Sequence, residues 1–320
     1  MVARARVIRP FFLAGGLGNQ LFQFAAALDM AGDARIELHT LLNNCRVNAN
    51  SEPELASFIL PSNVIISNKR YGRVVVRITS ALISLGLKEN SNFNKKLLKK
   101  FVSFLATFVL LLSLKKLVFP VVVNGVGFDD GYADTTHQIP IGYMQSYKWQ
   151  KNSKTKEMLM NLRPVENDKR IEEYEILAAS EKPIIIHYRF GDYVGNHNFG
   201  RPSQSYYLEC LESISQTNNE VNIWVFSDDI TKARLEFPSV YKSRVRWIDD
   251  LDDSVAATFE VMRLGSAYII ANSTFSWWAA YLNRQKTNLV YVPNPWFRKM
   301  RDPVQMCPDD WKAIAANYKD

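Results

Sequence analysis

The second half of the chain alternates short apolar segments with segments of helical periodicity. The apolar segments are rich in β-branched residues and lie at residues 183–189, 222–227, 244–248, 267–271 and 289–293. Parallel strands need long crossover connections, which are usually helices. The alternation therefore predicts an open, doubly wound parallel sheet with helices on both faces.

The first part of the chain begins in the same way. We predict a strand at residues 7–14, a helix at 21–31 and a second strand at 34–40, followed by a mostly helical region at 53–124. The fold class predicted for the whole chain is therefore α/β, with two doubly wound lobes and a cleft between them.

The boundary between the lobes is predicted from a polar stretch at residues 150–170, where Pro164 separates a helix from a linker. We divide the chain into an N-terminal lobe, 1–160, with a basic helical insertion at about 60–125, and a C-terminal lobe, 161–320.

Cysteine and histidine usage argues against a disulfide framework and against a metal centre. The cysteines are far apart and lack CxxC spacing, and the histidines form no HxxxH or HExxH pair. These residues are Cys45, Cys210 and Cys307, and His39, His137, His187 and His197. We expect a reducing compartment, no cofactor and no metal.

The 320-residue chain carries a formal net charge of +7, and much of the excess lies at residues 69–116. Basic balance suits nucleic acid, an anionic membrane surface or a phosphorylated substrate. Because basic and aromatic residues do not interleave, nucleic acid is not an expected partner. The apolar run at 101–114 is too short to span a bilayer, so it fits a core helix or a helix lying on an anionic membrane. With no signal peptide evident, we expect a cytoplasmic protein that can lie at the inner face of the plasma membrane.

The run IIIHYRFGDYV, residues 184–194, places His187 and Arg189 where a buried strand ends. Parallel sheets hold anionic ligands beyond such ends, and a guanidinium matches phosphate. The alternative is an ordinary surface ion pair between Arg189 and Asp192.

The turn GGLGNQ, residues 15–20, joins a strand to a helix. Gly16 and Gly18 allow close backbone approach, and a helix N-terminus attracts an anion. Leu21 stands where a dinucleotide fingerprint needs a third glycine. A tight structural turn is the alternative, but Asn19 is a polar residue at the helix start and favours a site.

Two further clusters follow predicted strands. Ser273 and Thr274 in NSTFSWWAAYL can cradle an anion at a helix start, and Asp228 and Asp229 in FSDD can bond a ribose or a guanine edge. Helix N-capping is the alternative explanation for the hydroxyls and for at least one of the aspartates.

In this order and spacing, GGLGNQLFQFAAAL, GYMQSYKW, HYRFGDYV, FSDD and NSTFSWWAAYL resemble the α-1,2-fucosyltransferase family, glycosyltransferase family 11. The resemblance covers nearly the whole chain except about residues 60–125. It implies a GT-B-like fold of two Rossmann-like lobes. The N-terminal lobe would lie on the acceptor side, and the C-terminal lobe would bind the nucleotide sugar. It also implies inverting, metal-independent transfer of L-fucose from GDP-β-L-fucose to a sugar hydroxyl, with galactose expected in an α-1,2 linkage. The expected acceptor is an oligosaccharide of surface polysaccharide or O-antigen synthesis, which can be lipid-linked.

The resemblance also carries roles onto the matching positions. Arg189 would hold the β-phosphate and stabilise the leaving group, and Asn19 would reach the reaction centre. The remaining donor-side residues would be His187, Asp228 and Asp229 at the guanine, Ser273 and Thr274 at phosphate, and Gly16 and Gly18. Tyr143 and Gln145 would lie near the acceptor.

One position departs from the family pattern HxRRxD, because Phe190 replaces the second arginine. The change removes a cation and leaves open a related donor such as GDP-colitose, or a non-catalytic nucleotide-binding protein. No general base is evident, and Asp192 fits a structural role in the turn beside Gly191 equally well.

Overall fold

The computed structural model divides into two compact units, unit 1 (Met1–Val165 with Pro303–Met306) and unit 2 (Glu166–Asp302 with Cys307–Asp320). The sequence placed this boundary after residue 160. The described residues are 8–32, 34–40, 45–67, 104, 121–123, 139–193, 195, 197–216, 221–303 and 305–319. Most of the predicted basic insertion, with nearly all of the apolar run 101–114, lies outside them.

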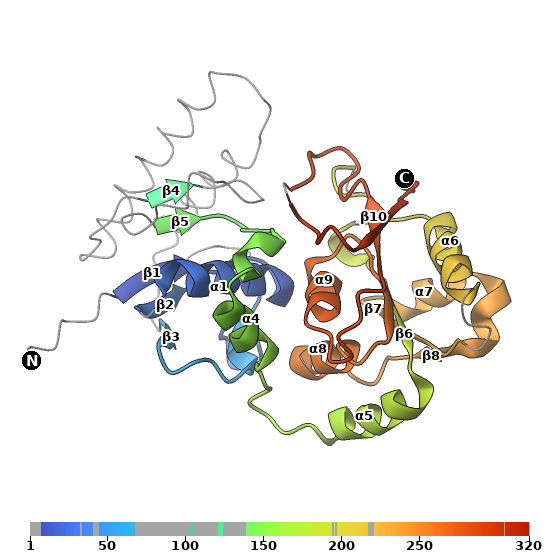
Figure 1. Ribbon diagram of the computed structural model, residues 1–320, viewed down its shortest axis with the longest axis horizontal. Coiled ribbons are helices and arrows are strands. Elements are labelled where there is room, and N and C mark those ends of the chain that lie inside the picture. Colours follow the sequence, from blue (N-terminus) through green and yellow to red (C-terminus); the bar gives the residue numbers. More distant parts are fainter. Residues whose placement is uncertain are drawn as a thin grey trace, which may run out of the picture. The chain divides into compact units, whose positions relative to one another are not determined.

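Unit 1 contains a three-stranded parallel sheet, in which β1 and β2 are joined by the helix α1 (Figure 1). A second, two-stranded parallel sheet follows. The strands are β1 (Ile8–Phe12), β2 (Arg35–His39), β3 (Val64–Ile66), β4 (Val121–Val123) and β5 (Ile139–Ile141), and the helical elements are α1 (Leu17–Ala31), η1 (Glu54–Ser57), η4 (Tyr147–Gln150) and α4 (Ser153–Met160). The predicted helical region at 53–124 is wrong where it is described at β3 and β4.

The first helix begins four residues earlier than its apolar periodicity predicts, at Leu17 instead of residue 21. Gly16 is the N-cap residue, and the Leu17 N–H donates to the carboxylate of Glu54 at 2.5 Å. A residue distant in sequence therefore accepts the hydrogen bond of a first-turn N–H group. A local sequence pattern does not reveal such a contact.

Unit 2 is built on a six-stranded parallel sheet in the order β11-β10-β9-β6-β7-β8. Its strands are β6 (Ile184–Tyr188), β7 (Ile223–Ser227), β8 (Val245–Trp247), β9 (Ala267–Ile269), β10 (Val290–Asn294) and β11 (Lys312–Ala315). Its helical elements are α5 (Lys169–Glu181), η5 (Gly191–Tyr193), α6 (Gln204–Ser215), α7 (Ile230–Glu236), η6 (Ser239–Arg244), α8 (Val255–Met262) and α9 (Thr274–Tyr281). Both units thus consist of parallel strands joined by helices, which confirms the predicted α/β class.

The central strand β6 is buried on both faces. Successive side chains of a strand point to opposite faces. Ile184, Ile186 and Tyr188 belong to one core cluster with α6, whereas His187 faces the opposite side and lies near Phe275 of α9. This alternation separates core residues from site residues along one segment.

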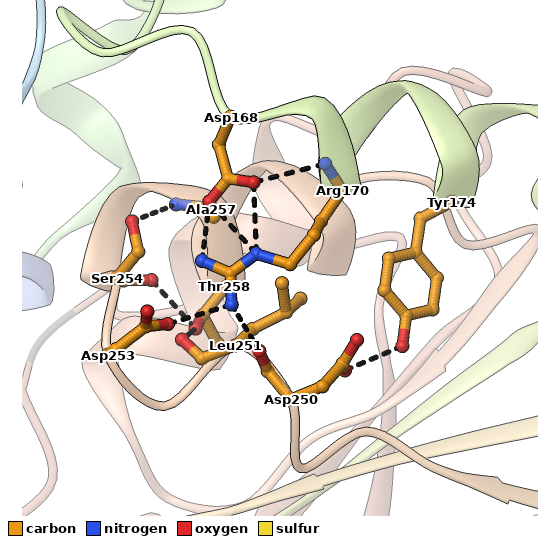
Figure 2. A network of polar contacts seen from close by, with 9 residues as sticks. All are labelled: Asp168, Arg170, Tyr174, Asp250, Leu251, Asp253, Ser254, Ala257 and Thr258. Carbon is orange, nitrogen blue, oxygen red and sulfur yellow. Dashed lines mark hydrogen bonds and ion pairs between the residues drawn. The ribbon is translucent and has the colours of Figure 1, made fainter.

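Two elements of unit 2 were missed by the sequence analysis, α5 and β11. The edge strand β11 is largely exposed, so it lacks a buried alternating face. Helix α5 is mainly polar and is fixed by polar contacts at its start. Asp168 accepts from the Arg170 N–H at 3.0 Å, and the Arg170 guanidinium pairs with Asp168 and with Asp253 at 2.9 Å (Figure 2). Tyr174 extends the network to Asp250 at 2.7 Å.

Candidate functional site

The winding of the unit 2 sheet reverses between β6 and β9. From β6 the chain proceeds to β7 and β8 on one side, and then returns to β9, β10 and β11 on the other. In open α/β sheets, ligands bind beyond the carboxyl ends of the strands at such a switch point. His187 and Arg189 at the end of β6, and Ser273 and Thr274 after β9, all lie at this edge.

Arg189 is held by a carboxylate from the neighbouring strand. Its Nη1 lies 3.0 Å from Oδ2 of Asp228, and the side chains are 17% and 23% exposed. Asp228 Oδ1 also accepts from the Phe190 N–H at 2.8 Å. The β6–β7 register pairs Tyr188 with Ser227, so the residues that follow in each strand meet. Gly191 leaves room for this pair, because a Cβ there would come within 2.6 Å of Asp228 Oδ2.

The sequence left two alternative explanations open here, an ion pair between Arg189 and Asp192 and helix capping by an aspartate of FSDD. Arg189 pairs with Asp228, and the side chain of Asp192 lies outside the described residues. Asp229 caps α7, since it accepts from the Lys232 N–H at 3.0 Å and pairs with Lys232 Nζ at 2.8 Å. These bonds with Lys232 lower the pKa of Asp229. The capping explanation is therefore confirmed for Asp229.

His187 is only 6% exposed, and its ring centroid lies 6.4 Å from that of Phe275. Among the described residues, its Nδ1 has no hydrogen-bond partner. Burial, and secondarily the charge of Arg189, lower the pKa of His187 to about 3. The imidazole is consequently neutral near pH 7, where it can exchange hydrogen bonds but adds no positive charge for a phosphate.

The start of α9 leaves donors for a ligand. Ser273 is its N-cap residue, but its side chain makes no capping hydrogen bond in the described structure. Simple capping therefore does not account for the Ser273 hydroxyl. The first-turn N–H groups of a helix lack intrahelical partners, so together with Ser273 and Thr274 they offer neutral donors beside Arg189 and His187.

Phe190 is a core residue. It is 1% exposed and belongs to the α6-side cluster with Ile186 and Tyr188. Its ring stacks with Tyr188 at 6.1 Å, and Arg201 lies over it at 4.9 Å from the ring centroid. The departure from the family pattern thus falls on the face opposite His187.

Unit 1 brings together Asn19, which the resemblance assigns to the reaction centre, and Gln145, which it assigns to the acceptor side. Gln145 Nε2 donates to Asn19 Oδ1 at 2.9 Å, which joins the start of α1 to the segment after β5. Gly15 adopts φ +71°, and a Cβ there would come within 2.4 Å of Asn19 Nδ2. In the described part of the chain, Gln145 Oε1 is buried without a hydrogen-bond partner. Tyr143 lies two residues before Gln145.

Gly16 is the N-cap residue of α1 and Gly18 is the second residue of the helix, but the helix start already holds a carboxylate. The Glu54 carboxylate accepts from the Leu17 N–H, and a Cβ on Gly16 would come within 3.3 Å of Glu54 Oε2. Sequence reasoning missed Glu54 because no local signal marks it. It also missed Tyr193 and Asn272, although both lie within motifs that the sequence analysis singled out.

The described residues include neither a metal-ligand cluster nor a membrane-spanning helix. They contain no group of three or more His, Cys, Asp or Glu side chains arranged to hold a metal ion. No described helix combines the length and apolar character needed to cross a membrane.

An arginine–carboxylate pair, a neutral histidine and a helix start thus lie at the switch point of the sheet, where α/β proteins commonly bind phosphorylated ligands. The model of glycosyl transferase family 11 matches residues 137–312, more than half of the chain, and the chain therefore belongs to this family. It is a glycosyltransferase.

Two curated relatives span nearly the whole chain. An α-1,2-colitosyltransferase of Escherichia coli is 24% identical, covering 94% of this chain and 97% of that protein. The O-antigen biosynthesis glycosyltransferase WbnK of Escherichia coli is 28% identical, covering 93% and 98%.

Similar solved structures include fucosyltransferase NodZ from Bradyrhizobium, with a TM-score of 0.45 and 11% identity over 86% of this chain and 92% of that one. ADP-heptose LPS heptosyltransferase II of E. coli has a TM-score of 0.49 and 11% identity over 96% and 90%.

Proposed function

We propose that the chain transfers L-fucose from GDP-β-L-fucose to a sugar hydroxyl, forming an α-1,2 linkage to galactose in O-antigen synthesis. The observation that carries this proposal is the Arg189–Asp228 pair at the β6–β9 switch point. Membership in glycosyl transferase family 11 and the O-antigen role named for WbnK support it.

In this proposal, Arg189 neutralises the diphosphate as the glycosidic bond breaks. Ser273, Thr274 and the first-turn N–H groups of α9 add neutral donors to phosphate oxygens. Glycosyl transfer passes through an oxocarbenium-like state, so stabilisation of the leaving group lowers the barrier directly. No metal is required where a guanidinium and aligned donors supply the positive potential, and we expect full turnover in the presence of EDTA.

His187 would contact the guanine as a neutral hydrogen-bonding group. Asp228 would act at the same site, with both of its oxygens already bonded to the Arg189 side chain and the Phe190 N–H. Asp229, as the cap of α7, would contribute through the shape of the β7–α7 turn.

On the acceptor side, Asn19 and Gln145 form an amide pair whose remaining groups can bond sugar hydroxyls. Tyr143 would add an aromatic surface close to this pair, and Gly16 and Gly18 would let backbone approach the ligand. The Asn19 side chain would thereby orient the attacking hydroxyl.

A second donor, GDP-colitose, is favoured by one specific observation, because one of the two relatives is named an α-1,2-colitosyltransferase. The two donors share GDP and a deoxysugar, so they make the same demands on Arg189. Only direct comparison of turnover distinguishes them.

The deciding experiment titrates purified protein with GDP, UDP, dTDP and CMP in a calorimeter, and then compares GDP-fucose with GDP-colitose in turnover. We expect GDP alone to bind. Arg189→Ala should lower kcat by about 10²- to 10³-fold, the cost typical of a lost transition-state donor. The control is Arg234→Ala, which removes an arginine from the exposed pair with Asp249. Preference for another nucleotide, or equal activity of the two variants, would overturn the proposal.

We also propose a peripheral location at the inner membrane face, where a lipid-linked oligosaccharide would be the acceptor. The support is the basic sequence at residues 69–116. Co-sedimentation with anionic vesicles should be lost at high salt and weakened when Lys95, Lys96, Lys99 and Lys100 are replaced by Gln. Binding that is insensitive to both changes would contradict this location.

A further inference from the structure

The loop that follows β6 is fastened to the end of β9. The Tyr193 hydroxyl donates to the carbonyl oxygen of Asn272 at 2.9 Å. In the opposite direction, Asn272 Nδ2 donates to the carbonyls of Phe199 and Gly200, each at 3.1 Å. Asn272 is almost completely buried, so these bonds are shielded from water.

The ring of Tyr193 lies between this fastening and the guanidinium of Arg189. The Arg189 Cζ is 5.8 Å from the Tyr193 ring centroid, within the range of a cation–π interaction. The Tyr193 ring also stacks with Phe199, whose centroid lies 5.1 Å away. The ring is thus fixed at its hydroxyl and by an aromatic neighbour.

Arg189 itself has a long side chain that loses rotamer freedom when it is placed. Asp228 holds Nη1 at 3.0 Å, and the Tyr193 ring lies against the central carbon of the guanidinium. The ion pair sets the position of one nitrogen, and the ring face favours one orientation of the guanidinium plane. Preorganised charge is what a phosphate site needs, since any reordering during binding weakens the ligand.

We propose that Tyr193 is a positioning residue that fixes the orientation of Arg189 for a nucleoside diphosphate, with Asn272 anchoring Tyr193. The proposal rests on the proposed function of Arg189. It assigns to Tyr193 no contact with the substrate, so its effect must pass through the guanidinium.

The test is a double-mutant cycle on GDP affinity measured by calorimetry, with the proteins Tyr193→Phe, Tyr193→Ala, Arg189→Ala and the two double variants. Tyr193→Phe keeps the ring and removes its anchor, and should weaken GDP binding about threefold. Tyr193→Ala removes both and should weaken it about five- to tenfold. In the Arg189→Ala background, both changes should have no further effect, because residues that act through one group are not additive.

Tyr241→Phe is the matched control, since its hydroxyl accepts a bond from Ser215 at 3.3 Å, and it should bind GDP like the parent protein. Additive losses in the Arg189→Ala background would show a merely structural role and overturn the inference. Parent-like affinity of both Tyr193 variants would also overturn it. Absence of GDP binding by the parent protein would instead refute the proposed function. Because Tyr193→Phe changes one atom, it tests the inference even if Tyr193→Ala does not fold.

Discussion

A buried ion network between the ends of α8 and α9 should control the stability of unit 2. Glu260 is fully buried and Arg263 is 1% exposed; their side chains pair at 2.7 Å. The second oxygen of Glu260 bonds Arg284, which also bonds Glu175. Arg263 Nε donates to the Leu282 carbonyl at 2.8 Å, so the network ties the end of α8 to the end of α9.

Replacement of Glu260 by Gln should therefore be costly. It retains the side-chain volume but removes the carboxylate charge that pairs with the buried Arg263 guanidinium. Breaking a buried pair by removing one partner costs about 3–5 kcal/mol. For a domain of this size, each kcal/mol corresponds to about 2–4 °C in Tm, so the midpoint should fall by on the order of 10 °C.

The assay is thermal unfolding followed by circular dichroism, with urea midpoints as a second measure. Asp249→Asn is the matched control, because Asp249 and Arg234 form a pair at 3.3 Å with both side chains 48% exposed. An exposed pair is worth at most about 1 kcal/mol, so this variant should shift Tm by about 3 °C or less. Equal shifts for Glu260→Gln and Asp249→Asn would refute the argument from burial.

Three further predictions concern single side chains. The folded pKa of His187, about 3, is below its unfolded value of about 6.5. The unfolded chain therefore binds more protons in this pH range, and the free energy of unfolding decreases as the pH is lowered. Between pH 7.5 and 5 the free energy of unfolding from urea titrations should fall by about 2 kcal/mol because of this group, and a His187→Gln variant with the same pH dependence would contradict the assignment. Glu54→Ala should cost about 1 kcal/mol, because Leu17 N–H loses its cap; Glu54→Gln should cost less, and unchanged melting of both would refute the cap. Arg170→Ala should cost about 1 kcal/mol and speed amide exchange at the start of α5, because the bond to Asp253 is lost from a partly exposed network; unchanged exchange would count against it.

The proximity of the residues that follow β6 and β7 is largely predictable from the sequence. Two consecutive strands of an α/β unit commonly become neighbours, so the residues after HY in β6 and after FS in β7 are expected at one edge. The structure confirms this neighbourhood in the Arg189–Asp228 pair. Which of the two aspartates meets Arg189 depends on side-chain direction, which the pattern does not encode, and Asp229 turns to its own helix.

Polar contacts between residues far apart in the chain could not be predicted from the sequence. Glu54 reaches Leu17 across 37 positions, and nothing near either residue specifies the other. The same holds for the bond between Gln145 and Asn19, which are 126 positions apart. Edge strand β11 was missed for a different reason, because a mostly exposed strand carries no alternation of apolar and polar residues.

Phe190 replaces the second arginine of the family pattern, and its position in the structure bears on what this replacement says about the donor. In the β6 segment, every second side chain enters the α6-side core, and Phe190 continues that series beyond Tyr188. The Arg201 guanidinium lies over the Phe190 ring and also pairs with Glu236. The aromatic side chain is therefore packed against defined neighbours in the core. Under the proposed function, the two candidate donor sugars are fucose and colitose, which lacks one hydroxyl of fucose. Discrimination between them would then come from groups that contact the sugar. A site that hydrogen-bonds the extra hydroxyl rejects the analogue lacking it by about 10⁴-fold, whereas a site shaped only by apolar contact discriminates by about 10²-fold. The ratio of kcat/KM for the two donors thus measures whether such a polar group exists, and Phe190→Arg should leave that ratio unchanged.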